Sequence, residues 1–155
     1  MEKLRLNIEI YATCEQVWDA IVNIEKYRIW TAPFYQSSYF EGSWNTGDTI
    51  RFLALNEAGE KSGMVAKIHS SVFPHHISIQ HLGFVTNGVD DTTSEEVKKW
   101  APSFENYTIT SVNEAISLFE VEMDVNEEFL EMMLEIWPKA MEELKIICEN
   151  QYNVH

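Results

Sequence analysis

The stretch NEEFLEMMLEIWPKAMEELKIIC, residues 126–148, decides the fold class of this chain. Its apolar residues recur at steps of three and four, which is the spacing of one helix face. They are Phe129, Met132, Met133, Ile136, Trp137, Ala140, Met141, Leu144 and Ile147 or Cys148. Asn126 suits the N-terminal cap, and Pro138 predicts a kink near the carbonyl of Leu134 because proline has no N–H donor. The sequence therefore predicts a long amphipathic C-terminal helix with one apolar face.

A strand and two short helices are predicted at the other end of the chain. Residues 4–10 alternate apolar and polar side chains, which is typical of a half-buried strand. Thr13 and Gln16 have the spacing of a capping box, so a helix is expected to begin between them. Asn23 suits the cap of a second short helix, which carries Trp30.

The middle of the chain predicts strands joined by turns. The candidate strands cover residues 35–41, 49–55, 63–73, 75–85, 107–112 and 116–125. In the hairpin around Pro74, Ile77, Ile79 and His81 share one face of the second arm. Residues 86–103 break the pattern, and we expect a long connection with one or two helical turns. Its acidic cluster is interpreted as a solvated loop, with a lid closed by Trp100 as the alternative.

Length and composition describe an acidic globular protein. The chain has 155 residues, 45% of them hydrophobic and 23% charged, with a formal net charge of −14. We expect one domain over residues 1–155, large enough to bury a core without disulfides. The negative charge argues against nucleic acid and anionic membrane surfaces as partners. The absence of a signal-peptide pattern and the presence of only two cysteines favour a cytoplasmic location.

The order of these elements predicts an α+β fold of the helix-grip type. A curved antiparallel sheet of about seven strands wraps around the long C-terminal helix, and two short helices follow the first strand. The space between such a sheet and such a helix is a natural place for a pocket.

Several segments resemble one family. ATCEQVWDAIVNIEKYRIW (Ala12–Trp30) is similar to the opening of START-like, or SRPBCC, proteins, and EGSWNTGDTIRF (Glu41–Phe52) resembles their glycine-bearing turn. HISIQHLG (His76–Gly83) and WPKAMEELK (Trp137–Lys145) resemble a later strand and the C-terminal helix. The nearest branch is the one named after activators of the heat-shock-protein-90 ATPase. The resemblance implies a birch-pollen-allergen-like fold with a hydrophobic cavity under the C-terminal helix, and it raises a chaperone-ATPase interaction module as one alternative function.

Aromatic and methionine side chains from several elements are predicted to face one another. They suit a cavity for a small hydrophobic or amphipathic molecule, because methionine adapts to irregular shapes and aromatic rings give large contact areas. The nine ligand-binding candidates are Trp30, Trp44, Phe52, His81, Tyr107, Phe119, Met133, Trp137 and Met141. We therefore expect a binding protein rather than an enzyme, with an ordinary filled core as the alternative interpretation.

His81 is the polar candidate with a chemical role of its own. Its imidazole is predicted to point inward, where it would orient a ligand or act as a general base. A cyclase- or hydrolase-type enzyme that uses His81 is thus a second alternative function. The other inward polar groups expected are Tyr107, Ser117 and Tyr35. No catalytic residue is assigned.

Other kinds of site have less support. His69, His75 and His76 match no zinc spacing, so no metal is expected. No phosphate-binding or dinucleotide-binding motif occurs, so no cofactor is expected. Cys14 and Cys148 are interpreted as buried, unreactive thiols. Formation of a homodimer stays open.

Overall fold

The computed structural model of the protein describes residues 1–150, so the last five residues of the predicted domain lie outside the described part. The elements in chain order are β1 (Glu2–Ile10), α1 (Cys14–Val22), α2 (Ile24–Trp30), β2 (Tyr39–Gly42), β3 (Thr49–Leu55), β4 (Lys61–Val72), β5 (His76–Thr86), β6 (Val89–Asp91), α3 (Glu95–Lys98), β7 (Ser103–Ser111), β8 (Ser117–Val125) and α4 (Glu127–Asn150).

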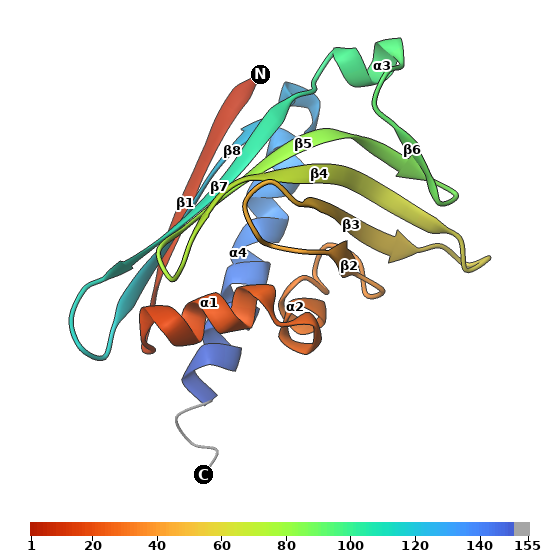
Figure 1. Ribbon diagram of the computed structural model, residues 1–155. Coiled ribbons are helices and arrows are strands. Elements are labelled where there is room, and N and C mark those ends of the chain that lie inside the picture. The colour runs from red at the N-terminus through yellow and green to blue at the C-terminus, as the bar shows by residue number, and fades with distance from the viewer. Residues whose placement is uncertain (151–155) are drawn as a thin grey trace.

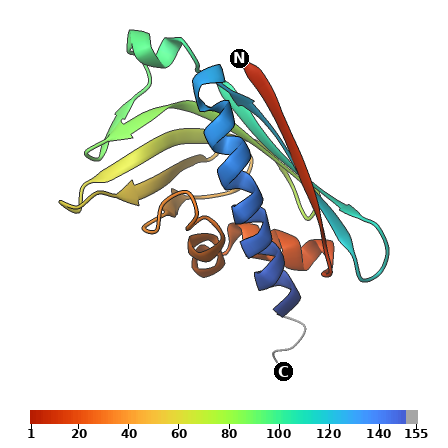
Figure 2. The same ribbon diagram turned by 180° about the vertical axis from the view of Figure 1, so that it is seen from behind.

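All described strands belong to one antiparallel sheet, with the order β1-β8-β7-β5-β4-β3-β2 and with β6 paired to β5 outside this order. Figures 1 and 2 show α4 running along one face of the curved sheet, with α1 and α2 beside its C-terminal half. The predicted α+β helix-grip class is confirmed. No helix within residues 1–150 is both long and apolar enough to cross a membrane.

The helix ends follow the local sequence signals. The Thr13 hydroxyl accepts a hydrogen bond from the Gln16 backbone N–H, and the Gln16 side chain accepts one from the Thr13 N–H, which completes the predicted capping box. The Asn23 side chain caps α2 by accepting from the Lys26 N–H at 3.1 Å. The long helix α4 continues through Pro138 as one element of 24 residues.

Three features of the strands differ clearly from the prediction. β2 begins at Tyr39, because residues 31–38 fold into consecutive turns that leave Tyr35 exposed. β7 begins at Ser103, where its backbone pairs with His81 of β5. The predicted connection 86–103 contains the short strand β6 as well as the expected helical turn, α3. Of these, the early start of β7 comes from pairing with a strand about 20 residues away in the chain.

Two one-residue bulges interrupt the pairing of β4 with β5. At one register shift, His69 of β4 has no partner in β5. At the other, Leu82 of β5 has no partner in β4. Since side chains alternate between the two faces of a strand, an extra residue moves all later side chains to the opposite face. Beyond Leu82, Val85 therefore joins a separate small apolar cluster with Leu53 and Val65, while the segment before Leu82 faces the main core.

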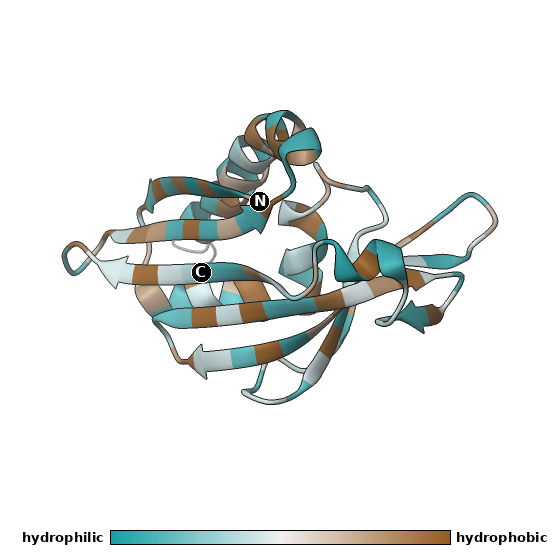
Figure 3. Cartoon of the chain, turned by 90° about the horizontal axis from the view of Figure 1, so that it is seen from above, coloured by the Kyte–Doolittle hydropathy of each residue, from teal (hydrophilic) through white to brown (hydrophobic). Residues whose placement is uncertain are grey.

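The main core lies between the sheet and the helices. It draws fully buried side chains from both layers: Ile10, Val17, Ile21, Trp30, Ile50, Ile68, Ile77, Ile79, Ile109, Phe119 and Leu144. Figure 3 shows the alternating bands of hydropathy along the strands that half-buried strands require. The sheet thus presents one apolar face to α1, α2 and α4.

The capping box of α1 gives a direct test of this local structure. We expect Thr13→Ala to lower the free energy of unfolding by about 1 kcal/mol, because one helix N–H loses its acceptor. Urea unfolding followed by tryptophan fluorescence measures the change. Thr92→Ala, at an exposed threonine, is the matched control. Equal losses in the two variants would contradict a role for the cap.

Candidate functional site

Strands β5 and β7 bring a polar cluster into the aromatic interior. In their antiparallel register, Ile77 lies opposite Tyr107 and Ile79 lies opposite Glu105. Residues two apart share a face, so His81 follows Ile79 on the inward side. His81 and Glu105 are therefore diagonal neighbours on adjacent strands, within reach of each other's side chains.

Glu105 is the centre of this cluster. The His81 Nε2 atom lies 2.9 Å from Glu105 Oε1, and the Tyr107 hydroxyl donates a hydrogen bond to Glu105 Oε2. The side chains of His81 and Glu105 are 7% and 13% exposed, and Tyr107 is buried. A carboxylate this far from water is costly unless donors satisfy it, and the two neighbours supply those donors.

The nearby tyrosines remain neutral because of this environment. Burial, followed by the Glu105 carboxylate and the hydrogen bond to it, raises the pKa of Tyr107 well above its usual value. Burial and the same carboxylate also raise the pKa of Tyr27. Both phenols thus keep their protons at any physiological pH, and Tyr107 acts as a donor to Glu105.

Three ring nitrogens near this cluster are buried without a hydrogen-bond partner. They are His81 Nδ1, Trp30 Nε1 and Trp44 Nε1. Buried polar atoms are normally hydrogen-bonded, so each such atom calls for an explanation. The interior is therefore well packed but incomplete in its hydrogen bonding.

The structure brings the nine predicted candidates into one core. Seven are buried, and Phe52 and Met133 are partly buried and pack against the others. The Trp137 ring centroid lies 6.1 Å from those of both Trp30 and Tyr107, while the Phe52 centroid lies 5.6 Å from that of Trp44. These separations suit edge-to-face and tilted aromatic contacts.

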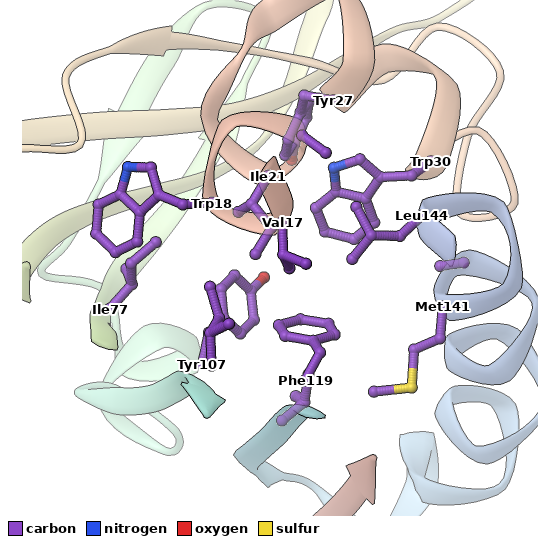
Figure 4. Packing of buried hydrophobic residues seen from close by; sticks show 14 of the residues in the cluster. Val17, Trp18, Ile21, Tyr27, Trp30, Ile77, Tyr107, Phe119, Met141 and Leu144 are labelled. Carbon is purple, nitrogen blue, oxygen red and sulfur yellow. The ribbon is translucent and has the colours of Figure 1, made fainter. Parts of the chain in front are cut away.

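Figure 4 shows the two sides of this core close up. The rings of Tyr107 and Phe119 come from the sheet, and Met141 and Leu144 come from α4 and point toward them. Trp30 of α2 lies beside Leu144. The side chains of the candidates themselves occupy the space between sheet and helix.

Two other polar residues expected to point inward behave differently. Tyr35 is 68% exposed in a turn, so its predicted inward position is wrong. Ser117 is buried, but its hydroxyl donates to the Ala12 carbonyl at 2.7 Å and ties β8 to the turn before α1. Neither belongs to the cluster around Glu105.

Glu105 is the member of the polar cluster that the sequence analysis did not identify. The predicted strand began at Tyr107, two residues too late, so Glu105 fell outside any strand. Extending the alternation of Ile109 and Tyr107 by one step would have placed a carboxylate on the inward face. The available signal was a charged residue at a core position within reach of an inward histidine.

Two of the hollows on the described surface are defined by their lining residues, and neither is lined by any of the nine candidates. The larger, of about 470 Å³, is lined by Glu41, Arg51, Leu53, Lys61, Val85, Gly88, Val89 and Asp90. The smaller, of about 170 Å³, is lined by Thr13, Cys14, Glu15, His75, Ser111, Asn113, Glu114 and Ser117. Across residues 1–150, no group of three or more His, Cys, Asp or Glu side chains is placed to hold a metal ion.

The curved antiparallel sheet, the two short helices after β1 and the long C-terminal helix define a START-like helix-grip fold of the Aha1-like kind. No protein-family model matches the chain, and no curated protein matches it either.

Solved structures match this fold over nearly the whole chain. The solution structure of the Aha1 dimer from Colwellia psychrerythraea is 15% identical, with a TM-score of 0.69, and the match covers 96% of this chain and 97% of that one. ChR145 from Cytophaga hutchinsonii is 15% identical, with a TM-score of 0.70 and coverages of 99% and 98%. Ms6760 from Mycobacterium smegmatis is 16% identical, with a TM-score of 0.65 and coverages of 96% and 89%. At these identities the likeness confirms the fold.

Removal of the central carboxylate tests the cluster. We expect Glu105→Ala to lower the free energy of unfolding by about 2 kcal/mol, because His81 Nε2 and the Tyr107 hydroxyl are left unpaired in the interior. Glu120→Ala, at an exposed position on β8, should change it by less than about 0.5 kcal/mol. Urea unfolding measures both. A loss no larger than that of the control would show that the three groups do not stabilise one another.

The thiol of Cys148 gives a further test of burial. Burial raises the pKa of Cys148 to about 12, so almost no thiolate exists near neutral pH. In a Cys14→Ser background, we expect no reaction of the native protein with a thiol-specific disulfide reagent at neutral pH. The same protein in denaturant should react completely. Rapid labelling of the native protein would contradict the buried position of Cys148.

Proposed function

We propose that the protein binds one small hydrophobic or amphipathic molecule between the sheet and α4. The observation that carries this proposal is an aromatic interior in which three buried ring nitrogens have no partner. Ligand pockets combine apolar walls with a few polar groups that fix orientation, and this interior has both. The START-like fold supports the proposal, because proteins with this fold are commonly ligand-binding proteins.

The first half of α4 provides a route to this interior. Phe129, Met132 and Leu134 are each at least 44% exposed, whereas Leu144 and Cys148 in the second half are fully buried. The first half therefore buries less apolar surface and is held less strongly. A ligand would enter by displacing this half of α4 and separating the rings beneath it.

A dye-binding experiment tests the proposal. Prodan is a neutral naphthalene dye whose emission shifts in apolar surroundings. We expect the protein to bind it and Met133→Lys to weaken binding about tenfold, because Met133 packs against the aromatic interior. Met132→Lys, at the adjacent exposed position of the same helix, should change the affinity by less than about twofold.

The outcome is clear in either direction. Absence of prodan binding by the wild-type protein would overturn the proposed function, and equal effects of the two lysines would remove the interior as the site. Native mass spectrometry of the complex counts bound molecules and also reports whether the chain forms a homodimer, which the sequence analysis left open. The cytoplasmic location stays a prediction.

The pairing of Glu105 with His81 favours the enzyme alternative as a second candidate. A carboxylate that holds one imidazole nitrogen leaves the other nitrogen free to accept a proton from a bound molecule. A binding protein releases its natural ligand unchanged, whereas an enzyme returns a product of different mass or structure. Mass spectrometry of the small molecules released after incubation with a cell extract distinguishes the two.

A further inference from the structure

We infer that the interior site takes a neutral ligand with a hydroxyl group, which donates a hydrogen bond to His81 Nδ1. This inference rests on the proposed function and specifies its ligand class. Its starting point is the contact between Glu105 and His81, in which Glu105 Oε1 lies 2.9 Å from His81 Nε2. The other carboxylate oxygen, Oε2, already accepts the proton of Tyr107.

The carboxylate decides which histidine nitrogen carries the proton. A carboxylate only accepts hydrogen bonds, so the contact with Glu105 requires His81 Nε2 to donate. In a neutral imidazole, Nδ1 then carries a lone pair and acts as an acceptor. His81 is 6% exposed and its Nδ1 has no partner, so the group that completes the site must be a donor.

A hydroxyl group also suits the neighbouring tryptophan. The rings of His81 and Trp44 both lie against Phe52, with centroids 5.8 Å and 5.6 Å from its centroid. The Trp44 N–H is a buried donor without a partner, whereas His81 Nδ1 is a buried acceptor without one. A hydroxyl oxygen both donates and accepts, so one such group matches the chemistry of both rings.

The charge of Glu105 selects against acids. An anionic head group at His81 Nδ1 would face the Glu105 carboxylate across a single imidazole ring, in an interior that screens charge poorly. We therefore assign the site to alcohols or phenols with an apolar body, in preference to fatty-acid carboxylates.

Three probes of one chain length test this assignment by displacing prodan. 1-Octanol carries the donor, 1-methoxyoctane keeps the oxygen without a donor, and octanoate carries a negative charge. We expect 1-octanol to displace prodan at concentrations about tenfold lower than either of the others, because only it supplies a neutral donor. Equal displacement by 1-octanol and 1-methoxyoctane, or stronger displacement by octanoate, overturns the inference.

A variant pair connects the preference to His81. His81→Phe keeps an aromatic ring but removes both nitrogens, so the ratio of the 1-octanol and 1-methoxyoctane affinities should fall to about one, whatever the change in the affinity for prodan. His69→Phe, at an exposed position of the same hairpin, should keep the full preference. A preference that survives in His81→Phe overturns the inference.

Nitrogen-15 NMR of the wild-type imidazole needs neither dye nor variant. In the free protein, we expect His81 Nδ1 to have the chemical shift of an imidazole nitrogen that carries no proton. This resonance should shift on addition of 1-octanol but not of 1-methoxyoctane. No shift with 1-octanol overturns the inference even when prodan binds. Absence of prodan binding overturns the proposed function and this inference with it, whereas prodan binding without the 1-octanol shift overturns the inference alone.

Discussion

The two bulges of the β4–β5 hairpin are the constraint on which the interior depends. Each adds one residue to one strand, so the side chains beyond it change face. The inward-facing side chains of β5 are those of Ile77, Ile79 and His81. Because the bulge residue Leu82 directly follows His81, this inward-facing row ends at the polar residue His81. Had the alternation continued without the bulge, Val85 would face the main core and its separate cluster with Leu53 and Val65 would not form.

Within that interior, one carboxylate organises the polar chemistry. Glu105 accepts from a histidine on the neighbouring strand and from a tyrosine on its own strand, so all three side chains are held by partners rather than by water. In a neutral imidazole, this arrangement makes Nε2 the donor to Glu105 and leaves Nδ1 as an acceptor directed away from it. A preorganised polar group in apolar surroundings discriminates between ligands that differ by a single donor, because the wrong ligand leaves that group unpaired.

Local signals in the sequence predicted most of the fold. The spacing of apolar residues over 126–148 and the pair Thr13–Gln16 depend on neighbours within a few residues, and both appear as predicted in the structure. The start of β7 depends on hydrogen bonds to β5, whose paired residue His81 precedes Ser103 by about 20 positions in the chain. For the same reason Glu105 was missed, while the inward position of His81 was predicted from alternation within one strand. The ring-to-ring packing of the candidates depends on side chains from several elements at once, which no single segment reveals.

The shared cap at Asn23 joins α1 and α2 into an elbow. The Asn23 N–H donates to the Asp19 carbonyl at 2.8 Å, so the residue closes α1, and its side chain opens α2 one residue later. An ion pair between Asp19 of α1 and Lys26 of α2 also connects the two helices. Only Asn23 separates the two helices, and its backbone and side chain are hydrogen-bonded to both of them. Trp30, at the end of α2, packs in the aromatic interior, while Trp18 of α1 packs on Phe73 in the β4–β5 turn at 5.4 Å. The elbow thus forms one continuous path of contacts from the aromatic interior to the turn of the hairpin.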